Sequence, residues 1–168
     1  MGELVALYDD AGIPCGTADR ARVRAENLRH AATAVVVRNG AGDVYVHRRT
    51  GTKDLYPGRY DFCAGGVLLA GEDPAESARR ELAEELGVTG VELVPLGFAD
   101  YADSRTRMRE FRFACTYDGP VTWQPDEVAW GAWVTPARLL EMLDELPFMP
   151  DSVAGFGAWL DDLRRGAT

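Results

Sequence analysis

Cysteine and histidine are scarce in this chain, and their spacing excludes several kinds of site. The 168 residues include three cysteines, Cys15, Cys63 and Cys115, and no two of them form a CxxC pair. Such wide spacing argues against a disulfide framework and against a thiolate zinc site. Only two histidines are present, His30 and His47, which are too few for a histidine-rich metal cage.

Excess positive charge and long apolar runs are also lacking. The formal net charge is −9, which argues against a nucleic acid polymer as partner, because that affinity depends on Lys and Arg at phosphates. No apolar run reaches membrane-spanning length, and the first ten residues lack the features of a signal peptide. We therefore expect a cytoplasmic protein with no membrane partner. Oligomeric state cannot be read from these features.

The composition and hydrophobic pattern predict a single globular α/β domain. Hydrophobic residues make up 46% of the chain and charged residues 27%. Residues 1–29 are predicted to form a strand–turn–helix extension packed on the same domain, with Thr17 capping the helix, and residues 30–165 form the rest. Further strands are expected near 32–39, 44–49, 91–99, 108–117 and 129–134, and helices near 74–86, 136–145 and 151–164. This mixed order predicts a β-sheet sandwiched between helices.

The helix after residue 73 carries an unusual group of acids. Asp73, Pro74 and Glu76 are typical of a capped helix start, and Gly87 of a helix end. At 100° per residue the apolar residues share one face, and the stripe beside that face holds three glutamates, Glu81, Glu84 and Glu85. We expect this stripe to be partly sheltered.

Repulsion among the three glutamates suggests a bound cation. On an exposed helix each like-charge pair costs only about 0.2–0.5 kcal/mol, but near a partly buried site it reaches roughly 3 kcal/mol. A divalent cation with oxygen ligands would reverse that repulsion. A solvated acidic face fits the helix equally well when the helix is taken alone. The preceding loop favours the metal, because Gly66 allows close backbone approach and can offer its carbonyl to a cation.

Loop and helix together match a family pattern. Gly66, five residues, Glu72, seven residues and then "RELAEELGV" (80–88) fill every specified position of GX5EX7REUXEEXGU, where U is bulky and apolar. This segment resembles the Nudix box. The resemblance implies a Nudix fold over residues 30–165 and hydrolysis of a diphosphate linkage in a nucleotide or other small organic diphosphate, using Mg²⁺ or Mn²⁺.

The resemblance also assigns roles to the residues of the box. It implies that Glu81, Glu84 and Glu85 ligate the metal, with one of them instead handling the proton of the attacking water. Glu72 and Arg80 would pair and hold the loop against the helix. Such a metal screens phosphate charge, lowers the pKa of water and orients in-line attack.

Outside the box the chain is similar to the isopentenyl-diphosphate isomerase-like branch of the superfamily. The similar segments are "LYDDAGIPCGTADR", "LRHAATAVVV", "HRRTGTKDLYPGRYD" and "DEVAWGAWVTP". The isomerase cysteine and histidine positions are occupied here by Gly65 and Val67, and His30 matches one isomerase metal-binding histidine without its companion. These departures, with the complete box, favour a hydrolase over an isomerase. A Nudix-fold binding module without catalysis is a third alternative, which the intact box argues against.

Other charged residues carry weaker expectations. Glu127 lies where Nudix enzymes often place an extra acid near the metal, and Glu110 matches an acid of the isomerases. Arg105, Arg107 and Arg109 alternate, so in a strand they would line one face, which we interpret as solvated rather than phosphate-binding.

Four further residues are assigned from their surroundings in the sequence. Trp130 and Trp133 are predicted to pack in the core, Cys15 to be a packing residue, and His47 to lie on a strand surface.

Overall fold

The computed structural model describes residues 2–166, and within them nine strands form one mixed sheet. The strands are β1 (Leu4–Tyr8), β2 (Pro14–Asp19), β3 (Arg29–Arg38), β4 (Val44–Arg49), β5 (Tyr60–Asp61), β6 (Cys63–Ala64), β7 (Val94–Ala102), β8 (Arg107–Thr116) and β9 (Val128–Val134). The helices are α1 (Arg20–Glu26), α2 (Pro74–Leu86), α3 (Pro136–Glu145), α4 (Pro150–Gly155) and α5 (Gly157–Gly166).

The long strand β3 organises the sheet. It runs parallel to β8 along its whole length, and β8 pairs antiparallel with β7. On its other side β3 pairs with β4 only at Arg38 and Val44, while β4 pairs with β5 and β9. The sheet therefore has two arms, β3–β8–β7 and β5–β4–β9, which are joined at one end.

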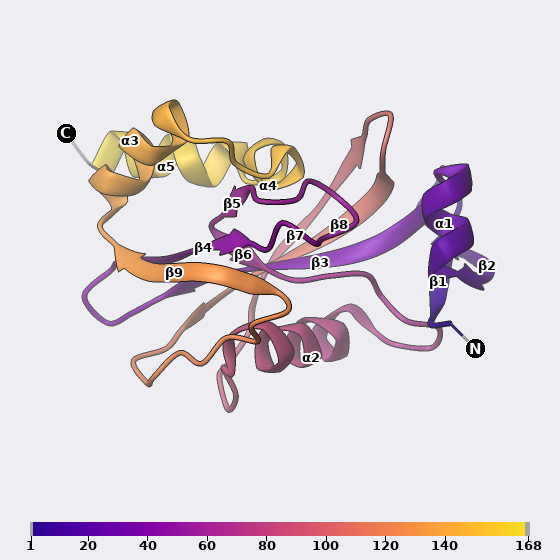
Figure 1. Cartoon of the computed structure of the whole chain (residues 1–168), viewed down its shortest axis with the longest axis horizontal. Helices are drawn as coiled ribbons and strands as arrows, with labels where there is room; N and C mark the ends of the chain where they lie inside the picture. The colour runs from indigo at the N-terminus through magenta and orange to yellow at the C-terminus, as the bar shows by residue number, and fades with distance from the viewer. Residues whose placement is uncertain (1, 167–168) are drawn as a thin grey trace.

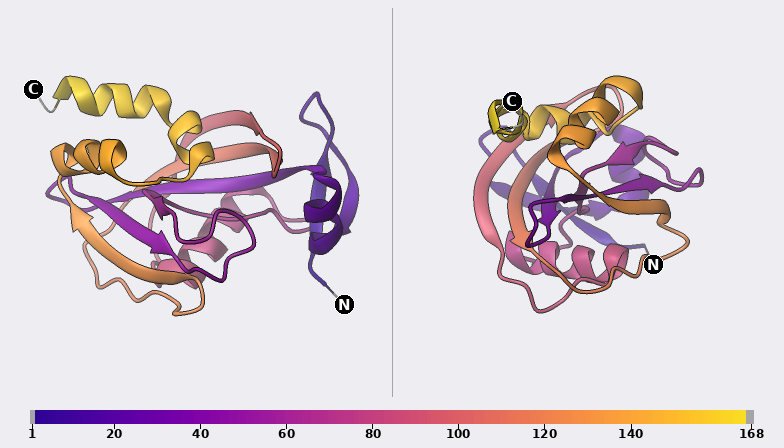
Figure 2. Two further views of the ribbon diagram at one scale, coloured as in Figure 1. Left: turned by 45° about the horizontal axis from the view of Figure 1, so that its top comes forward. Right: turned by 90° about the vertical axis from the view of Figure 1, so that its left-hand side faces the viewer.

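Helices cover both faces of this sheet, as the sequence predicts. Helix α2 lies on one face and helices α3, α4 and α5 lie on the other (Figures 1 and 2). Alternate residues of β3 pack toward the two layers: Val36 joins the cluster of Leu139 and Leu160, whereas Val35 joins that of Leu82. A strand buried on both faces reads as a continuous apolar run, which explains the "AVVV" segment.

The N-terminal elements close one end of β3 (Figure 1). Strands β1 and β2 form an antiparallel hairpin, and Leu7 of β1 pairs with His30 of β3. A small core of Val5, Ala18 and Val23 anchors α1 against the hairpin. The extension thus packs against the rest of the molecule.

Two expected helix boundaries are wrong. Thr17 does not cap a helix, because it pairs with Ala6 in the hairpin and the helix begins only at Arg20. The last expected helix is two helices, with the break at Phe156. Glycines flank that residue on both sides, and glycine is a poor helix former. The ring of Phe156 is buried against Phe62 and Trp159.

Three expected side-chain positions are also wrong. Trp130 is 40% exposed although it lies in β9, and Cys15 is exposed in the N-terminal hairpin. His47 is buried rather than on the surface, and this burial lowers its pKa to about 3. An alternating pattern fixes which residues share a strand face but not whether that face is covered.

All three cysteines are free, as their spacing predicts. Between residues 2 and 166, no helix combines the length and apolar character needed to cross a membrane.

Candidate functional site

A cavity of about 380 Å³ lies where the two arms of the sheet diverge. Its lining comes from α1, the central part of β3, the loop after β4, the segment after β6, α2 and the start of α4. The cavity thus gathers side chains from both halves of the sequence and from both faces of the sheet.

Two glycines bring the box segment close to β3. The Thr33 amide donates a hydrogen bond to the Gly66 carbonyl oxygen at 2.8 Å. A Cβ at Gly65 would lie 1.9 Å from the Thr33 carbonyl oxygen, so the close backbone approach requires glycine there. A Cβ at Gly66 would lie 2.5 Å from Glu81 Oε1. Gly66 therefore leaves room beside a carboxylate that faces the cavity.

Helix α2 begins and ends as its sequence predicts. The Glu76 amide donates to Asp73 Oδ1 at 3.0 Å, and the Asp73 amide donates to Glu76 Oε2 at 3.2 Å, which completes the capping box. Gly87 ends the helix in the left-handed conformation with φ of 64°. These ends fix the register of the helix and so the direction in which its glutamates point.

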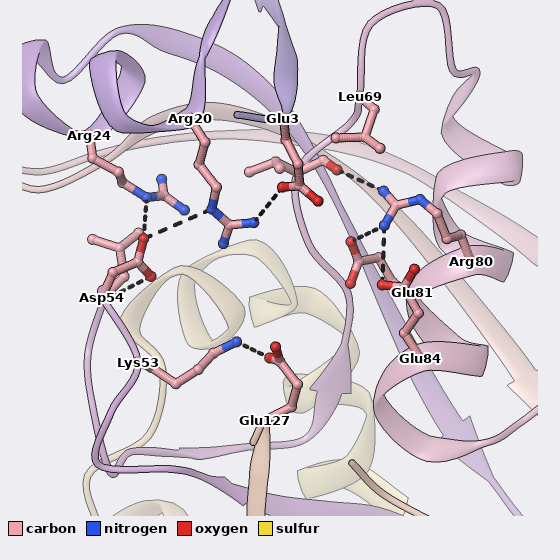
Figure 3. Close-up of polar contacts among 12 residues, drawn as sticks. Glu3, Arg20, Arg24, Lys53, Asp54, Leu69, Arg80, Glu81, Glu84 and Glu127 are labelled. Carbon is pink, nitrogen blue, oxygen red and sulfur yellow. Dashed lines mark hydrogen bonds and ion pairs between the residues drawn. The ribbon is translucent and has the colours of Figure 1, made fainter. Parts of the chain in front are cut away.

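Arg80 ties the acidic residues of the box together (Figure 3). Its guanidinium donates to both carboxylate oxygens of Glu72, at 2.6 and 3.1 Å, and to the Val67 carbonyl at 3.2 Å. The same group donates to Glu81 Oε1 at 2.8 Å and to Glu84 Oε2 at 3.3 Å. The expected Glu72–Arg80 pair is therefore present, and it holds the loop against the helix. The hydrogen bond from Arg80 keeps the pKa of Glu72 below its usual value.

The three glutamates of the stripe differ strongly in burial. Glu85 is 6% exposed, and the side chains of Glu81 and Glu84 are 12% and 57% exposed. Burial, with the neighbouring charge of Glu81, raises the pKa of Glu85 to about 8. Burial also raises the pKa of Glu81, although Arg80 opposes that change. The expected burial of the stripe is therefore found for Glu81 and Glu85 but not for Glu84.

The metal-ligand set is not already assembled within residues 2–166, where no three His, Cys, Asp or Glu side chains surround one point. Arg80 engages Glu81 and Glu84 instead. The residues nevertheless fit a divalent cation. Glu81 and Glu85 both line the cavity, and Gly66 leaves space beside Glu81. Oxygen ligands of this kind suit Mg²⁺ or Mn²⁺.

Glu127 lines the same cavity, at the end of a loop that precedes β9. Its carboxylate pairs with the ammonium group of Lys53, which belongs to the loop after β4 (Figure 3). The extra acid expected from the sequence is thus near the box, and a lysine holds it.

A second group of acids lines the same cavity. Asp61 comes from β5, Glu110 from β8 and Asp151 from the first turn of α4. Burial, reinforced by the charge of Asp151, raises the pKa of Asp61 to about 7, and burial also raises the pKa of Glu110. The isomerase resemblance pointed to Glu110 alone. The other two were missed, because nothing in the sequence shows that β5 and α4 meet there.

Several cations also line the cavity, and those of the N-terminal extension were missed by sequence reasoning. Arg20, Arg24 and Arg49 line it, two of them from the N-terminal extension. The alternating arginines do not: Arg109 pairs with Asp100 at 2.9 Å and lies over the Phe98 ring. A high local density of arginine in α1, with three in seven residues, was the available signal.

Comparison with known proteins assigns this architecture to a family. Residues 28–154 match the family model for the NUDIX domain. The Nudix hydrolase orf19 of Rhodococcus erythropolis is 44% identical, with 90% of this chain and 89% of the relative covered. The Nudix hydrolase YfcD of Escherichia coli K12 is 40% identical, with 94% and 87% covered.

Solved structures show the same fold. DR0079 from Deinococcus radiodurans superposes with a TM-score of 0.74 at 24% identity, covering 97% of this chain and 98% of its own. The MutT protein of Methanosarcina mazei Go1 gives a TM-score of 0.64 at 20% identity, covering 83% and 96%.

Proposed function

This chain belongs to the Nudix hydrolases, and from that premise we propose that it cleaves a diphosphate linkage in a nucleotide or other small organic diphosphate with the help of Mg²⁺ or Mn²⁺. The observation that carries the proposal is the buried Glu85 carboxylate beside Glu81, at the wall of a cavity large enough for a small molecule.

The glutamates of α2 would hold the cation. Glu81 and Glu85 face the cavity from a low-exposure position, where a bound cation offsets the cost of two neighbouring negative charges. Glu84, Gly66 and Glu127 would complete the ligand set or its immediate surroundings. When bound, the ion neutralises charge on the diphosphate and activates a water for in-line attack.

The remaining residues of the box keep the glutamates in place. The bidentate Glu72–Arg80 pair joins the loop to α2, and Arg80 also fixes Val67. One carboxylate of the stripe would accept the proton of the attacking water, and a cation bound beside it favours the ionised form that this role needs. Glu85 is our choice for that role, because it is buried at the cavity beside Glu81, and Glu81 would then be the principal ligand of the cation.

Isomerase chemistry fits this cavity poorly. The isomerase cysteine position is Gly65, where any side chain would meet the Thr33 carbonyl oxygen at 1.9 Å. Cys63, two residues earlier, is buried, and burial holds the pKa of its thiol well above the usual value. A thiol of that kind is a poor proton carrier at neutral pH.

A substrate panel tests the proposal and separates it from a silent binding module. Dinucleotides, nucleotide sugars, NADH, ADP-ribose, coenzyme A and deoxynucleoside triphosphates are incubated with Mg²⁺ and assayed for cleavage, with phosphatase coupling to release phosphate where needed. We expect turnover of at least one compound, abolished by EDTA. Absence of turnover across the panel and with both metals would support the binding module.

The variant Cys63→Ala tests the isomerase alternative. We expect it to keep most of the hydrolytic activity, because attack by water on a diphosphate needs no thiol. We also expect wild type to form no dimethylallyl diphosphate from isopentenyl diphosphate. Isomer formation that disappears in Cys63→Ala would replace the hydrolase with an isomerase.

A further inference from the structure

Helix α1 presents two of its arginines to the cavity. Arg20 and Arg24 are four residues apart, so they lie on one helix face, and both line the cavity. Arg22, between them, points elsewhere and pairs with Glu26 at 3.0 Å. All three precede residue 28, where the match to the family model begins. The N-terminal extension therefore supplies cavity residues that the family match does not include.

Two acids lie close to this arginine pair, and the side chain of each is about half exposed to solvent. Arg24 Nε lies 3.1 Å from Asp54 Oδ2, and Arg20 Nε lies 3.9 Å from the same oxygen. The other partner, Glu3, contacts Arg20 at 3.2 Å and is half exposed to solvent. One buried arginine thus shares a single carboxylate with its neighbour.

Further positive charge lies close by. The Arg24 side chain is only 19% exposed, and burial lowers its pKa, with smaller contributions from the like charges of Arg20 and Arg49, while Asp54 opposes the change. The Asp54 carboxylate already supplies an anion to this cluster, at a position where a phosphate would meet the same two guanidinium groups. In a chain with a net charge of −9, a group of arginines at the same cavity as the glutamates of α2 needs a specific explanation.

We propose that Arg20 and Arg24 bind a phosphate group of the diphosphate substrate, and that this phosphate displaces the Asp54 carboxylate from between them. The inference rests on the proposed function and adds a second anchor to it. The cation at α2 would engage one part of the diphosphate, and the arginine pair would hold the other across the cavity. Guanidinium groups suit this role because their planar donors match phosphate oxygens in pairs.

Asp54 is well placed to be exchanged for a ligand. It belongs to the loop after β4, its side chain is 46% exposed, and Oδ2 is the oxygen that meets both arginines (Figure 3). The other oxygen, Oδ1, accepts the Leu55 amide at 2.9 Å. Asp54→Asn keeps that acceptor while it removes the negative charge, so it weakens the competitor and preserves the turn.

Affinity for a diphosphate mimic tests the inference without any turnover. Methylenediphosphonate, whose P–C–P bridge is not hydrolysed, is titrated by calorimetry into wild type and variants in the presence of Mg²⁺. We expect Arg20→Gln and Arg24→Gln to bind at least about tenfold more weakly. Arg24→Lys keeps the charge and should lose less. Asp54→Asn should bind at least about threefold more tightly.

Arg22→Gln is the matched control, since it removes an arginine from the same helix on the outward side. It should bind the mimic within about twofold of wild type. Melting temperatures measured without ligand identify any variant that fails to fold. If both arginine variants fail to fold, the affinity of Asp54→Asn for the mimic tests the inference by itself. Unchanged affinity in Arg20→Gln and Arg24→Gln, weaker binding by Asp54→Asn, or no binding by wild type would overturn the inference.

The two proposals fail in different ways. If the arginine variants bind the mimic as wild type does while wild type still hydrolyses a compound of the panel, only the arginine assignment is wrong. If binding depends on the arginines but no compound is cleaved, the anion site stands and the hydrolase proposal is wrong.

Discussion

Single residues set the shape and charge of this site, and Gly66 shows how little space the site leaves for an added side chain. Its missing Cβ leaves the space that the Glu81 carboxylate occupies, with 2.5 Å between Glu81 Oε1 and the place that a Cβ would take. The nearby Gly65 instead admits the Thr33 carbonyl. Two adjacent glycines thus serve different purposes: Gly65 leaves space for a backbone carbonyl, and Gly66 leaves space for a proposed metal ligand.

Gly66→Ala should therefore reduce activity far more than stability. The added methyl group displaces the flexible end of Glu81, which is cheap for the fold, but a shift of about 1 Å at a ligand can cost on the order of 10²-fold in rate. Steady-state kinetics and melting temperature are compared with Gly51→Ala, a glycine with nothing near its Cβ position. Equal activity in the two variants would show that Glu81 tolerates the displacement.

We predict that the free energy of unfolding depends on pH through the buried Asp61 carboxyl group. Its pKa is about 7 in the folded protein against an ordinary value of 3.8, so folding favours the protonated form. The stability from this group is complete below pH 3.8 and is lost as the pH rises through 7. Asp61→Asn removes this loss and keeps the Oδ1 acceptor for the Cys63 amide.

We expect the free energy of unfolding of Asp61→Asn, relative to wild type, to rise by roughly 2–4 kcal/mol between pH 4 and pH 8. Urea unfolding at the two pH values, with EDTA present, measures this difference. A constant difference would mean that Asp61 ionises normally inside the protein.

At the scale of elements, the ends of α2 were readable from the sequence because local chemistry determines them. Asp73, Pro74, Glu76 and Gly87 each act through their own backbone and nearest turn. The start of α1 was misread for the opposite reason: Thr17 is a good cap locally, but pairing with β1 takes precedence. Contacts between distant segments decide such cases.

Asp73→Ala should destabilise the protein by about 1 kcal/mol, the usual cost of losing an N-cap acceptor. Because the rest of the helix and its glutamates stay in place, turnover by the folded protein should change little. Urea unfolding and kinetics are measured on the same samples, with Asp118→Ala as a loop control outside the cavity. A large loss of turnover with normal stability would imply that the cap directly positions the site.

The same limit explains which parts of the site were predictable. The box glutamates, Glu72, Arg80 and Gly66 occupy one continuous segment with a specific spacing, so the sequence pointed to all of them. Arg20, Asp61 and Asp151 reach the cavity from three separate elements, and only the folded arrangement brings them to it. The alternating arginines after residue 104 had a clearer pattern than Arg20 and Arg24, yet they lie outside the cavity.

At the scale of the whole molecule, the sheet has two arms that separate beyond Arg38 and Val44, and the proposed chemistry lies between them. Helix α2 contributes the acids that we propose to hold a cation, and the N-terminal extension contributes arginines. Strands β5 and β8 and helix α4 contribute Asp61, Glu110 and Asp151. In our proposal an acidic protein binds an anionic substrate in this way, because the cation and the arginines would be concentrated at one cavity.

The central claim is that the sheltered glutamates of α2 carry out metal-dependent hydrolysis, and Glu85→Gln tests it most directly. The measurement is the rate of Mg²⁺-dependent cleavage of the best panel substrate by wild type, Glu85→Gln and the exposed control Glu92→Gln. We predict a loss of at least about 10²-fold in Glu85→Gln, with a melting temperature no lower than that of wild type, and no loss in the control. A folded Glu85→Gln protein that hydrolyses the substrate at nearly the wild-type rate would contradict the account.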